Sequence, residues 1–471
     1  MSQSSDSSDR LAELGYEQGL SRRLKTWEVV ALAMADVSPT MAVLLLTAGV
    51  FFVGGTFAVG ANLLVAVAVL MIALCLGELA SIYPLAGGMY SLARFILPGP
   101  MVWITMFNFI LQGIIIPAST VLGIGLFLKD LWPDLAISNE VIALIALAAV
   151  TGLTLIRIEI GAYVTAAVVV VEVVVLGIIS LAAIAHPVQS LGDVVFNPVK
   201  LADGALVTVT LGVMLATIAP AFNVINGYDA ALGFSEELIG GERRIGRAVL
   251  LSAVLASVLI LIPLIAAVVA APDLTAFLSA PIPIVYSVNA SLGSGAKAIV
   301  DIGVSIALFN ATLSLFLYFS RALYATGRDQ MWPAPISSKL MELNRFKSPG
   351  WAVVVLAVPA AALVFLSALN WLIIFAGTII AATYFCIAIA ALVSRVRKPD
   401  LERPFRMPAW PIPPLIVIGF IGVALVTQET QYLVGEAVLI VVALAFWAGS
   451  RVWSPTSRGV AGATGPVDHS G

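Results

Sequence analysis

The chain has 471 residues, of which 61% are hydrophobic and only 11% are charged, with a formal net charge of −3 and a mean hydropathy of +1.06. Soluble domains carry roughly 25% charged residues, so this composition excludes a soluble enzyme and a disordered protein, and the acidic balance excludes a nucleic-acid binder. The two cysteines, Cys75 and Cys386, are too few for a disulfide scaffold, and long unbroken apolar runs indicate transmembrane helices rather than a transmembrane barrel.

A membrane-spanning helix needs about 20 apolar residues, and the sequence contains twelve runs of that kind. We expect residues 1–26 and 451–471 to form polar tails, which are rich in Ser and Gly and typical of disorder. The remaining residues, 27–450, are predicted to form one transmembrane domain. Its predicted helices are 28–52, 57–82, 99–128, 138–157, 160–185, 206–234, 246–271, 297–325, 350–368, 370–394, 412–428 and 432–450.

The distribution of basic residues predicts the orientation of the chain. With the N-terminus in the cytoplasm, 21 of the 24 Lys and Arg residues fall on the cytoplasmic side, and only Lys129, Lys200 and Lys297 fall outside. Basic residues are enriched in cytoplasmic loops, so this distribution predicts a multi-pass protein of the cytoplasmic membrane with both termini in the cytoplasm. A missed helix would assign every later loop to the opposite side of the membrane and mix the basic residues between the two sides. The distribution therefore also supports the count of twelve helices.

Two apolar runs are interrupted near their middle. The first contains DVSPT at residues 36–40, and the sixth contains PAFNVINGYD at residues 220–229. Proline removes a backbone donor, and non-helical backbone at membrane depth persists only where it is buried in protein or lines a cavity. Two broken helices five spans apart therefore favour an inverted-repeat transporter with its substrate at the breaks, although two ordinary proline kinks would give the same pattern.

Three segments resemble a known family. Residues 78–90 (ELASIYPLAGGMY) resemble the second-helix exit of the amino acid–polyamine–organocation (APC) family, and residues 222–237 are similar to its sixth helix, which ends in an acidic pair. Residues 320–333 (SRALYATGRDQMWP) resemble its eighth-helix exit. The resemblance implies an all-α polytopic membrane protein with a leucine-transporter-like fold (LeuT-like). In that fold, inverted repeats of five helices lie at about 28–185 and 206–394, helices 1 and 6 are broken, and two extra helices occupy 412–450.

The helix breaks predict where a substrate binds. Free N–H groups attract anions and free C=O groups attract cations, so crossed breaks suit an amino acid, which carries both charges. In the family the first break is usually rich in glycine and its amides receive the substrate carboxylate. This sequence has a proline and no glycine there, which resembles the branch that takes γ-aminobutyrate, choline or polyamines. The predicted substrate-binding residues are Asp36, Ser38, Pro39, Thr40, Phe222, Asn223, Asn226, Gly227 and Tyr228.

Two carboxylates, Asp36 and Glu172, are predicted to take part in coupling. Each lies inside an apolar run, where a charge costs about 2.5–3.5 kcal/mol and is functional by default. Asp36 would hold an ammonium group or carry the coupling proton, because burial disfavours the charged form. Several family members have a Lys near the place of Glu172 that stands in for sodium, so an acid here offers a proton carrier or a partner for a substrate amine. The alternative for Asp36 is a structural cap on freed backbone N–H groups, and the alternative for Glu172 is a structural hydrogen bond to the first or eighth helix.

A gate is predicted near the cytoplasmic mouth. Arg321 and Arg328 lie on one helix face and could pair with Glu78 or with the acidic pair at 236–237, or could simply follow the positive-inside rule. The family often has an aromatic gate over the substrate at the place of Ile225.

The sequence therefore predicts a secondary transporter of amino acids that works by alternating access and is coupled to protons rather than sodium. An amine, polyamine or γ-aminobutyrate carrier and an amino acid exchanger are the alternatives. No catalytic, metal or cofactor site is indicated, since only two His occur and no carboxylates cluster in the sequence. The expected partners are a small-molecule substrate, protons and the lipid bilayer, with no nucleic acid.

Overall fold

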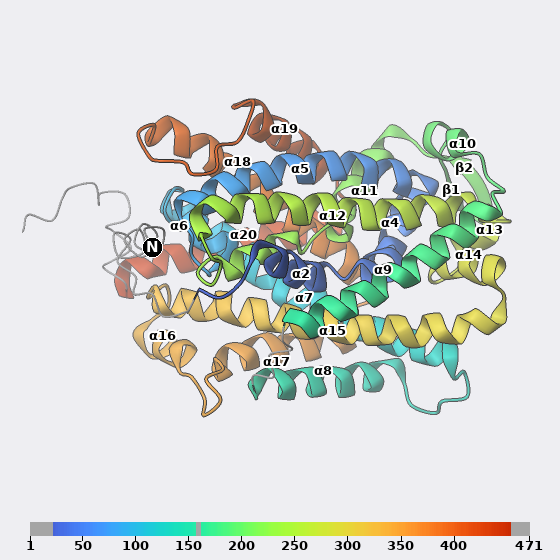
Figure 1. Ribbon diagram of the computed structural model, residues 1–471, viewed down its shortest axis with the longest axis horizontal. Coiled ribbons are helices and arrows are strands. Elements are labelled where there is room, and N and C mark those ends of the chain that lie inside the picture. The colour runs from blue at the N-terminus through green and yellow to red at the C-terminus, as the bar shows by residue number, and fades with distance from the viewer. Residues whose placement is uncertain (1–21, 157–161, 454–471) are drawn as a thin grey trace, which may run out of the picture.

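The computed structural model describes residues 22–156 and 162–453, so most of the two predicted tails lies outside the described residues. The long helices, among them α5, α7, α12 and α15, run along the longest axis of the molecule (Figure 1). Within the described residues, eight helical segments are long and apolar enough to cross a membrane, and three shorter apolar helices accompany them. The first segment, Thr26–Ile82, has 57 residues and contains two of the predicted spans.

The first half of the chain begins with an interrupted helix. It consists of α2 (Thr26–Val37), α3 (Pro39–Met41), the π-helix η1 (Ala42–Leu46) and α4 (Thr47–Gly54), and the 3-10 turn η2 (Gly55–Phe57) leads into α5 (Ala58–Ile82). The helices that follow are α6 (Gly88–Arg94), α7 (Gly99–Leu131), α8 (Asn139–Leu155), α9 (Ala162–Ala185) and α10 (Leu191–Phe196). Pro100 lies in the first turn of α7, where its missing N–H costs no helical hydrogen bond.

A β-hairpin stands where the sequence predicts the start of the sixth helix. β1 (Val199–Ala202) pairs antiparallel with β2 (Ala205–Thr208), with the first residue of β1 opposite the last of β2. The prediction of a helix from residue 206 is therefore wrong. Asp203 and Gly204 both have positive φ, and this two-residue turn favours a hairpin despite the apolar character of β2.

The second half of the chain contains the second interrupted helix. α11 (Leu211–Val224), capped by the side chain of Thr210, ends at an irregular segment before the 3-10 helix η3 (Tyr228–Phe234). The remaining helices are α12 (Gly241–Val269), α13 (Leu274–Ser279), α14 (Pro283–Leu292), α15 (Ser294–Arg328), α16 (Ala334–Met341), α17 (Gly350–Leu366), α18 (Leu369–Arg397), α19 (Ile412–Val426) and α20 (Thr430–Trp453).

Helices five positions apart in the predicted order pack against each other. α12 packs along α5, α15 along α7 and α17 along α8, while α2 contacts η3 and α4 contacts α11. Small residues permit a close approach of α5 and α12, because a Cβ on Gly77 of α5 would lie 3.0 Å from the Cα of Gly246 on α12. The two interrupted helices are thus neighbours at the centre of this arrangement.

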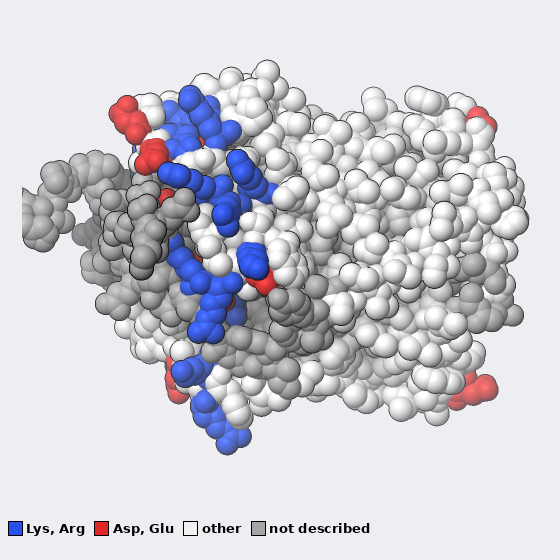
Figure 2. Space-filling view, viewed as in Figure 1, with Lys and Arg blue, Asp and Glu red and all other residues white. Residues whose placement is uncertain are grey.

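Basic side chains are segregated along the long axis. Lys and Arg gather toward the end that holds α6 and α16, and the opposite half of the visible face shows none (Figure 2). This separation is the one expected of a membrane protein whose basic residues lie on one side of the bilayer.

Candidate functional site

The first helix break lies at Ser38, whose φ of 38° is in the left-handed region that residues other than glycine rarely adopt. α2 ends at Val37, and the next helical segment begins at Pro39, which has no N–H. The N–H of Thr40 is therefore the first free donor of the new helix, and the helix start surrounds it with partial positive charge. The break thus creates a binding position for an acceptor, and preferably for an anionic one.

Glu172 of α9 occupies this position. Its Oε2 atom accepts the N–H of Thr40 at 3.1 Å and the hydroxyl of Ser38 at 3.0 Å. The residue is 4% exposed, and its other oxygen, Oε1, has no hydrogen-bond partner among the described residues. Nor does any ion pair in the described ranges join Glu172 to a basic side chain. The carboxylate of the fifth apolar run therefore faces the first break.

The second break follows α11, where Ile225 and Asn226 are not helical and Gly227 has a φ of 97°. A Cβ on Gly227 would lie 2.8 Å from the backbone N of Val37 and 3.0 Å from the carbonyl carbon of Asp36. Both neighbours are backbone atoms that cannot rotate away, so only glycine permits this approach. The two breaks are therefore in direct contact.

Asp36 lies two residues before the first break. It is 4% exposed, and its Oδ1 atom has no hydrogen-bond partner in the part of the chain that the structure describes. The hydroxyl of Thr40 is also buried and without a partner there. Buried acceptors without partners are costly, and carboxylates more than hydroxyls. Oδ1 of Asp36 and Oε1 of Glu172 are thus two buried carboxylate oxygens without a partner among the described residues.

A hydrogen-bond network surrounds Asp229, two residues after Gly227. Its carboxylate accepts the hydroxyl of Tyr318 on α15 at 3.3 Å and that of Tyr384 on α18 at 3.4 Å. The hydroxyl of Tyr384 lies closer to Oδ1 of Asn226, at 2.8 Å, so the two acceptors share its single proton. The sequence does not single out either tyrosine, because a lone Tyr in an apolar run is typical of packing. The network ties the second break to two further helices.

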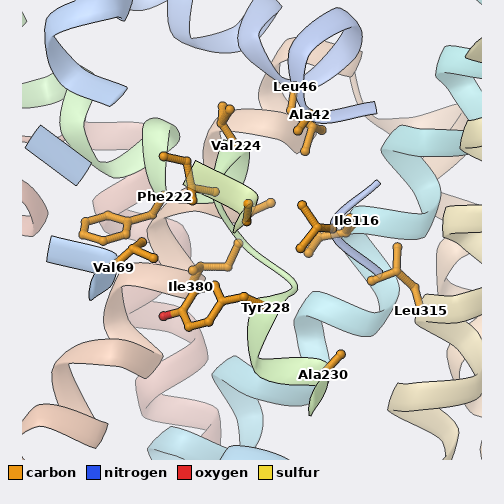
Figure 3. Packing of buried hydrophobic residues seen from close by; sticks show 14 of the residues in the cluster. Ala42, Leu46, Val69, Ile116, Phe222, Val224, Tyr228, Ala230, Leu315 and Ile380 are labelled. Carbon is orange, nitrogen blue, oxygen red and sulfur yellow. The ribbon is translucent and has the colours of Figure 1, made fainter. Parts of the chain in front are cut away.

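Apolar side chains enclose the two breaks. In Figure 3 the irregular segment after Val224 runs between Ile116 on one side and Ile380 and Tyr228 on the other. Ile225, the predicted gate, is fully buried. This enclosure keeps water from the polar atoms and strengthens their electrostatic interactions.

Two of the predicted substrate ligands face away from the first break. The ring of Phe222 packs against those of Tyr384 and Phe420, with centroids 6.0 and 6.2 Å apart. The side-chain amide of Asn223 donates to the carbonyl of Ile373 on α18 at 3.0 Å. Phe222 therefore faces α18 and α19 and Asn223 faces α18, whereas Gly227 contacts the backbone just before the first break.

The sequence predicts that Arg321 pairs with Glu78 or with the acidic pair at 236–237, and the structure contradicts the first alternative. Glu78 is fully buried and accepts from Nε of Arg395 at 2.8 Å, Nε of Arg403 at 3.1 Å and the backbone N–H of Met407 at 2.7 Å. The sequence predicts several arginines on the same side of the membrane as Glu78, but it does not show which of them lie closest to the Glu78 carboxylate. The contacts of Glu78 join α5 to α18 and to the segment that follows α18.

Arg321 lies 3.5 Å from the carboxylate of Glu237, as the second alternative predicts, and both side chains are partly exposed. The backbone carbonyl of Glu237 also accepts the N–H of Leu24, just before α2. The neighbouring Glu236 accepts the N–H of Ala86 at 3.0 Å, in the turn before α6. The acidic pair thus links α15, the chain before α2 and the end of the 78–90 segment.

The second and eighth helix exits also meet. Nη1 of Arg94 lies 2.8 Å from Oδ1 of Asp329, and the hydroxyl of Tyr90 donates to Oδ2 at 3.1 Å. Gly88 has a φ of 63°, and a Cβ there would lie 2.7 Å from the hydroxyl of Tyr318. Two of the family-like segments are therefore in contact although they are separate in the sequence.

Proteins similar to this chain carry permease or transporter names. A family model described as amino acid permease matches residues 24–450. The chain is 32% identical over 165 residues to the branched-chain amino acid permease BcaP of Lactococcus lactis subsp. cremoris, a match that spans 34% of this chain and 35% of that protein. It is 22% identical over 437 residues to BcaP of Bacillus subtilis, spanning 88% of this chain and 89% of that protein. An uncharacterised transporter of Mycobacterium tuberculosis is 26% identical over 428 residues, which is 89% of each protein.

Proposed function

The chain belongs to the amino acid permease family, as its three sequence motifs predict, and from this premise we propose that it is a secondary active transporter working by alternating access. In this proposal an amino acid binds between the two helix breaks in the cytoplasmic membrane. The observation that carries the proposal is the contact of Gly227 with the backbone of Val37. Irregular backbone inside a membrane domain costs hydrogen bonds, and transporters retain it where it binds the substrate.

The packing of the helices supports an inverted repeat. The helical segments amount to twelve crossings when the first 57-residue segment is counted as two and the three shorter apolar helices are included. Four pairs that stand five crossings apart pack on each other, namely the two broken helices, α5 with α12, α7 with α15, and α8 with α17. Both termini lie in the cytoplasm in this proposal, on the side where the Lys and Arg residues gather (Figure 2).

We propose proton coupling because the breaks carry acidic side chains. Asp36, Glu172 and Asp229 are all at most 4% exposed. A proton that binds one of them neutralises a buried charge, so its binding changes what else the site can hold. Glu172 is the proposed proton carrier, since it bonds directly to the first break and its Oε1 remains without a partner in the described ranges.

Uptake into liposomes tests the function. Labelled leucine, chosen because relatives are named branched-chain amino acid permeases, should accumulate in sodium-free buffer under an inward proton gradient. A protonophore should abolish the accumulation. Glu172→Gln should lose it, whereas Glu436→Gln, which neutralises a buried carboxylate between α20 and α7, should keep it. An absolute requirement for sodium would refute proton coupling, and purely downhill flux would refute active transport.

A carrier of amines without a carboxylate is the second candidate function. The acidic side chains and the proline at the first break favour it, because they offer a cation more partners than an anion. Putrescine that inhibits uptake more strongly than neutral amino acids would support this candidate. Inhibition by neutral amino acids alone would contradict it.

A further inference from the structure

The donors of the first break already bind a carboxylate of the protein, that of Glu172. A helix start favours a carboxylate, and the first N–H that this one offers, on Thr40, is bonded to Oε2 of Glu172. Pro39 contributes no N–H, and the hydroxyl of Ser38 is directed to the same carboxylate oxygen. A second carboxylate arriving from a ligand would find these donors in use.

We propose that Glu172 serves as the built-in carboxylate of the first break, so that a transported ligand docks its ammonium group, and not its carboxylate, against this break. The inference rests on the proposed function, because it assumes a ligand between the two breaks. It assigns Glu172 the role of a specificity-determining residue.

The unsatisfied carboxylate oxygen of Glu172 at the break suits an ammonium group. Such a group has three N–H donors and no acceptor. The oxygens without a partner in the described chain are Oε1 of Glu172, Oδ1 of Asp36 and Oγ1 of Thr40, and all three are buried. Because a buried carboxylate oxygen without a partner is costly, a bound cation would stabilise the site that the protein alone leaves incomplete.

The charges at the break disfavour the opposite orientation of the ligand. Asp36 and Glu172 would both repel a ligand carboxylate, and the repulsion is strong in a site from which water is excluded. Arg321, the basic residue that the sequence predicts as a gate, contacts Glu237 rather than these acids. An ammonium group would instead be attracted by these two carboxylates.

Three probes that share one side chain separate the two orientations. They are leucine, isoamylamine, which lacks the carboxylate, and 4-methylpentanoate, which lacks the ammonium group. Thermal unfolding of the purified protein measures binding, because a ligand of the native state raises its stability. We expect leucine and isoamylamine to stabilise the wild type and 4-methylpentanoate not to do so.

Substitutions connect the selectivity to the break. Glu172→Gln keeps an acceptor for Thr40 but removes the charge, so it should weaken isoamylamine about tenfold, the value of one charge-assisted hydrogen bond. Asp36→Asn, a second isosteric variant, should weaken the same ligand in case the first variant is unstable. Glu436→Gln is the matched control, since it neutralises a carboxylate that is 8% exposed and bonded to Asn108, away from both breaks.

The outcomes distinguish this inference from the proposed function. Stabilisation by 4-methylpentanoate but not by isoamylamine would overturn the inference, as would equal binding of isoamylamine by wild type, Glu172→Gln and Asp36→Asn. Accumulation of leucine in liposomes without any binding of isoamylamine would overturn the inference alone. Binding of isoamylamine without accumulation of any ligand would overturn the proposed function alone. Absence of stabilisation by all three probes would contradict the inference.

Discussion

A single methyl group at Gly227 tests the contact between the two breaks. The φ of 97° strains any residue with a side chain, and the added Cβ would lie 2.8 Å from the backbone N of Val37. Left-handed backbone costs about 1–2 kcal/mol, and overpacking of a tight site adds about 1–3 kcal/mol. We therefore expect Gly227→Ala to lower the free energy of unfolding by about 2–5 kcal/mol.

Gly204 supplies the matched control. Its φ is 78° in the two-residue hairpin turn, but a Cβ there would meet no heavy atom within 4 Å. Gly204→Ala should therefore cost only the backbone strain, about 1–2 kcal/mol. The difference between the two variants isolates the contact of Gly227 with the first break.

Denaturant unfolding of both variants in the same detergent measures this difference, and the stabilisation by leucine measures the effect on the site. We expect the loss of ligand stabilisation in Gly227→Ala alone, because the added methyl group separates the two breaks. Equal destabilisation of the two variants, with ligand binding unchanged, would refute the packing of the breaks.

Two further substitutions test contacts that sequence alone does not reveal. Glu78→Gln should destabilise the protein by about 3–5 kcal/mol, because two arginines lose their shared buried partner, whereas Glu237→Gln, whose ion pair is partly exposed, should cost at most about 1 kcal/mol. Denaturant unfolding of the pair checks this, and equal losses would contradict it. Tyr384→Phe keeps the ring and removes the hydroxyl contacts to the second break, so it should reduce leucine uptake while changing stability by about 1 kcal/mol. Uptake at the wild-type rate would remove this tyrosine from the site.

The helix breaks and the buried acids could be predicted because each violates a strong local rule. Pro39 interrupts one apolar run. Gly227 follows Asn223 and Asn226 in a second apolar run, and Glu172 lies among valines in a third. Helix-breaking and acidic residues are rare inside membrane helices and are retained where they have a structural or functional role. They can therefore be recognised in a single sequence. The same rules do not determine which residue of another helix each of them contacts.

The hydrogen-bond partners of these residues cannot be predicted from the sequence. They depend on how helices far apart in the chain are rotated and on how deep in the membrane each residue lies. Glu172 reaches Thr40 across 132 positions, and Tyr384 reaches Asn226 across 158. Hydrophobic periodicity cannot supply such information when a helix is apolar on all sides, as α9 is. The arginines around Glu78 were missed for a related reason, since all of the basic residues at this end satisfy the positive-inside rule equally well.

The chemistry of the first break follows from the combination of Ser38, Pro39 and Glu172. A glycine-rich break would adopt left-handed backbone without strain and would offer several N–H groups, whereas Ser38 is strained and Pro39 offers none. The strain persists because the surrounding structure holds it, and two hydrogen bonds to one carboxylate oxygen contribute to that hold. The same carboxylate that stabilises the break also sets its charge. Glu172→Gln keeps an acceptor for Thr40 and removes the charge, so its effect on ligand selectivity measures the charge of the break apart from its geometry.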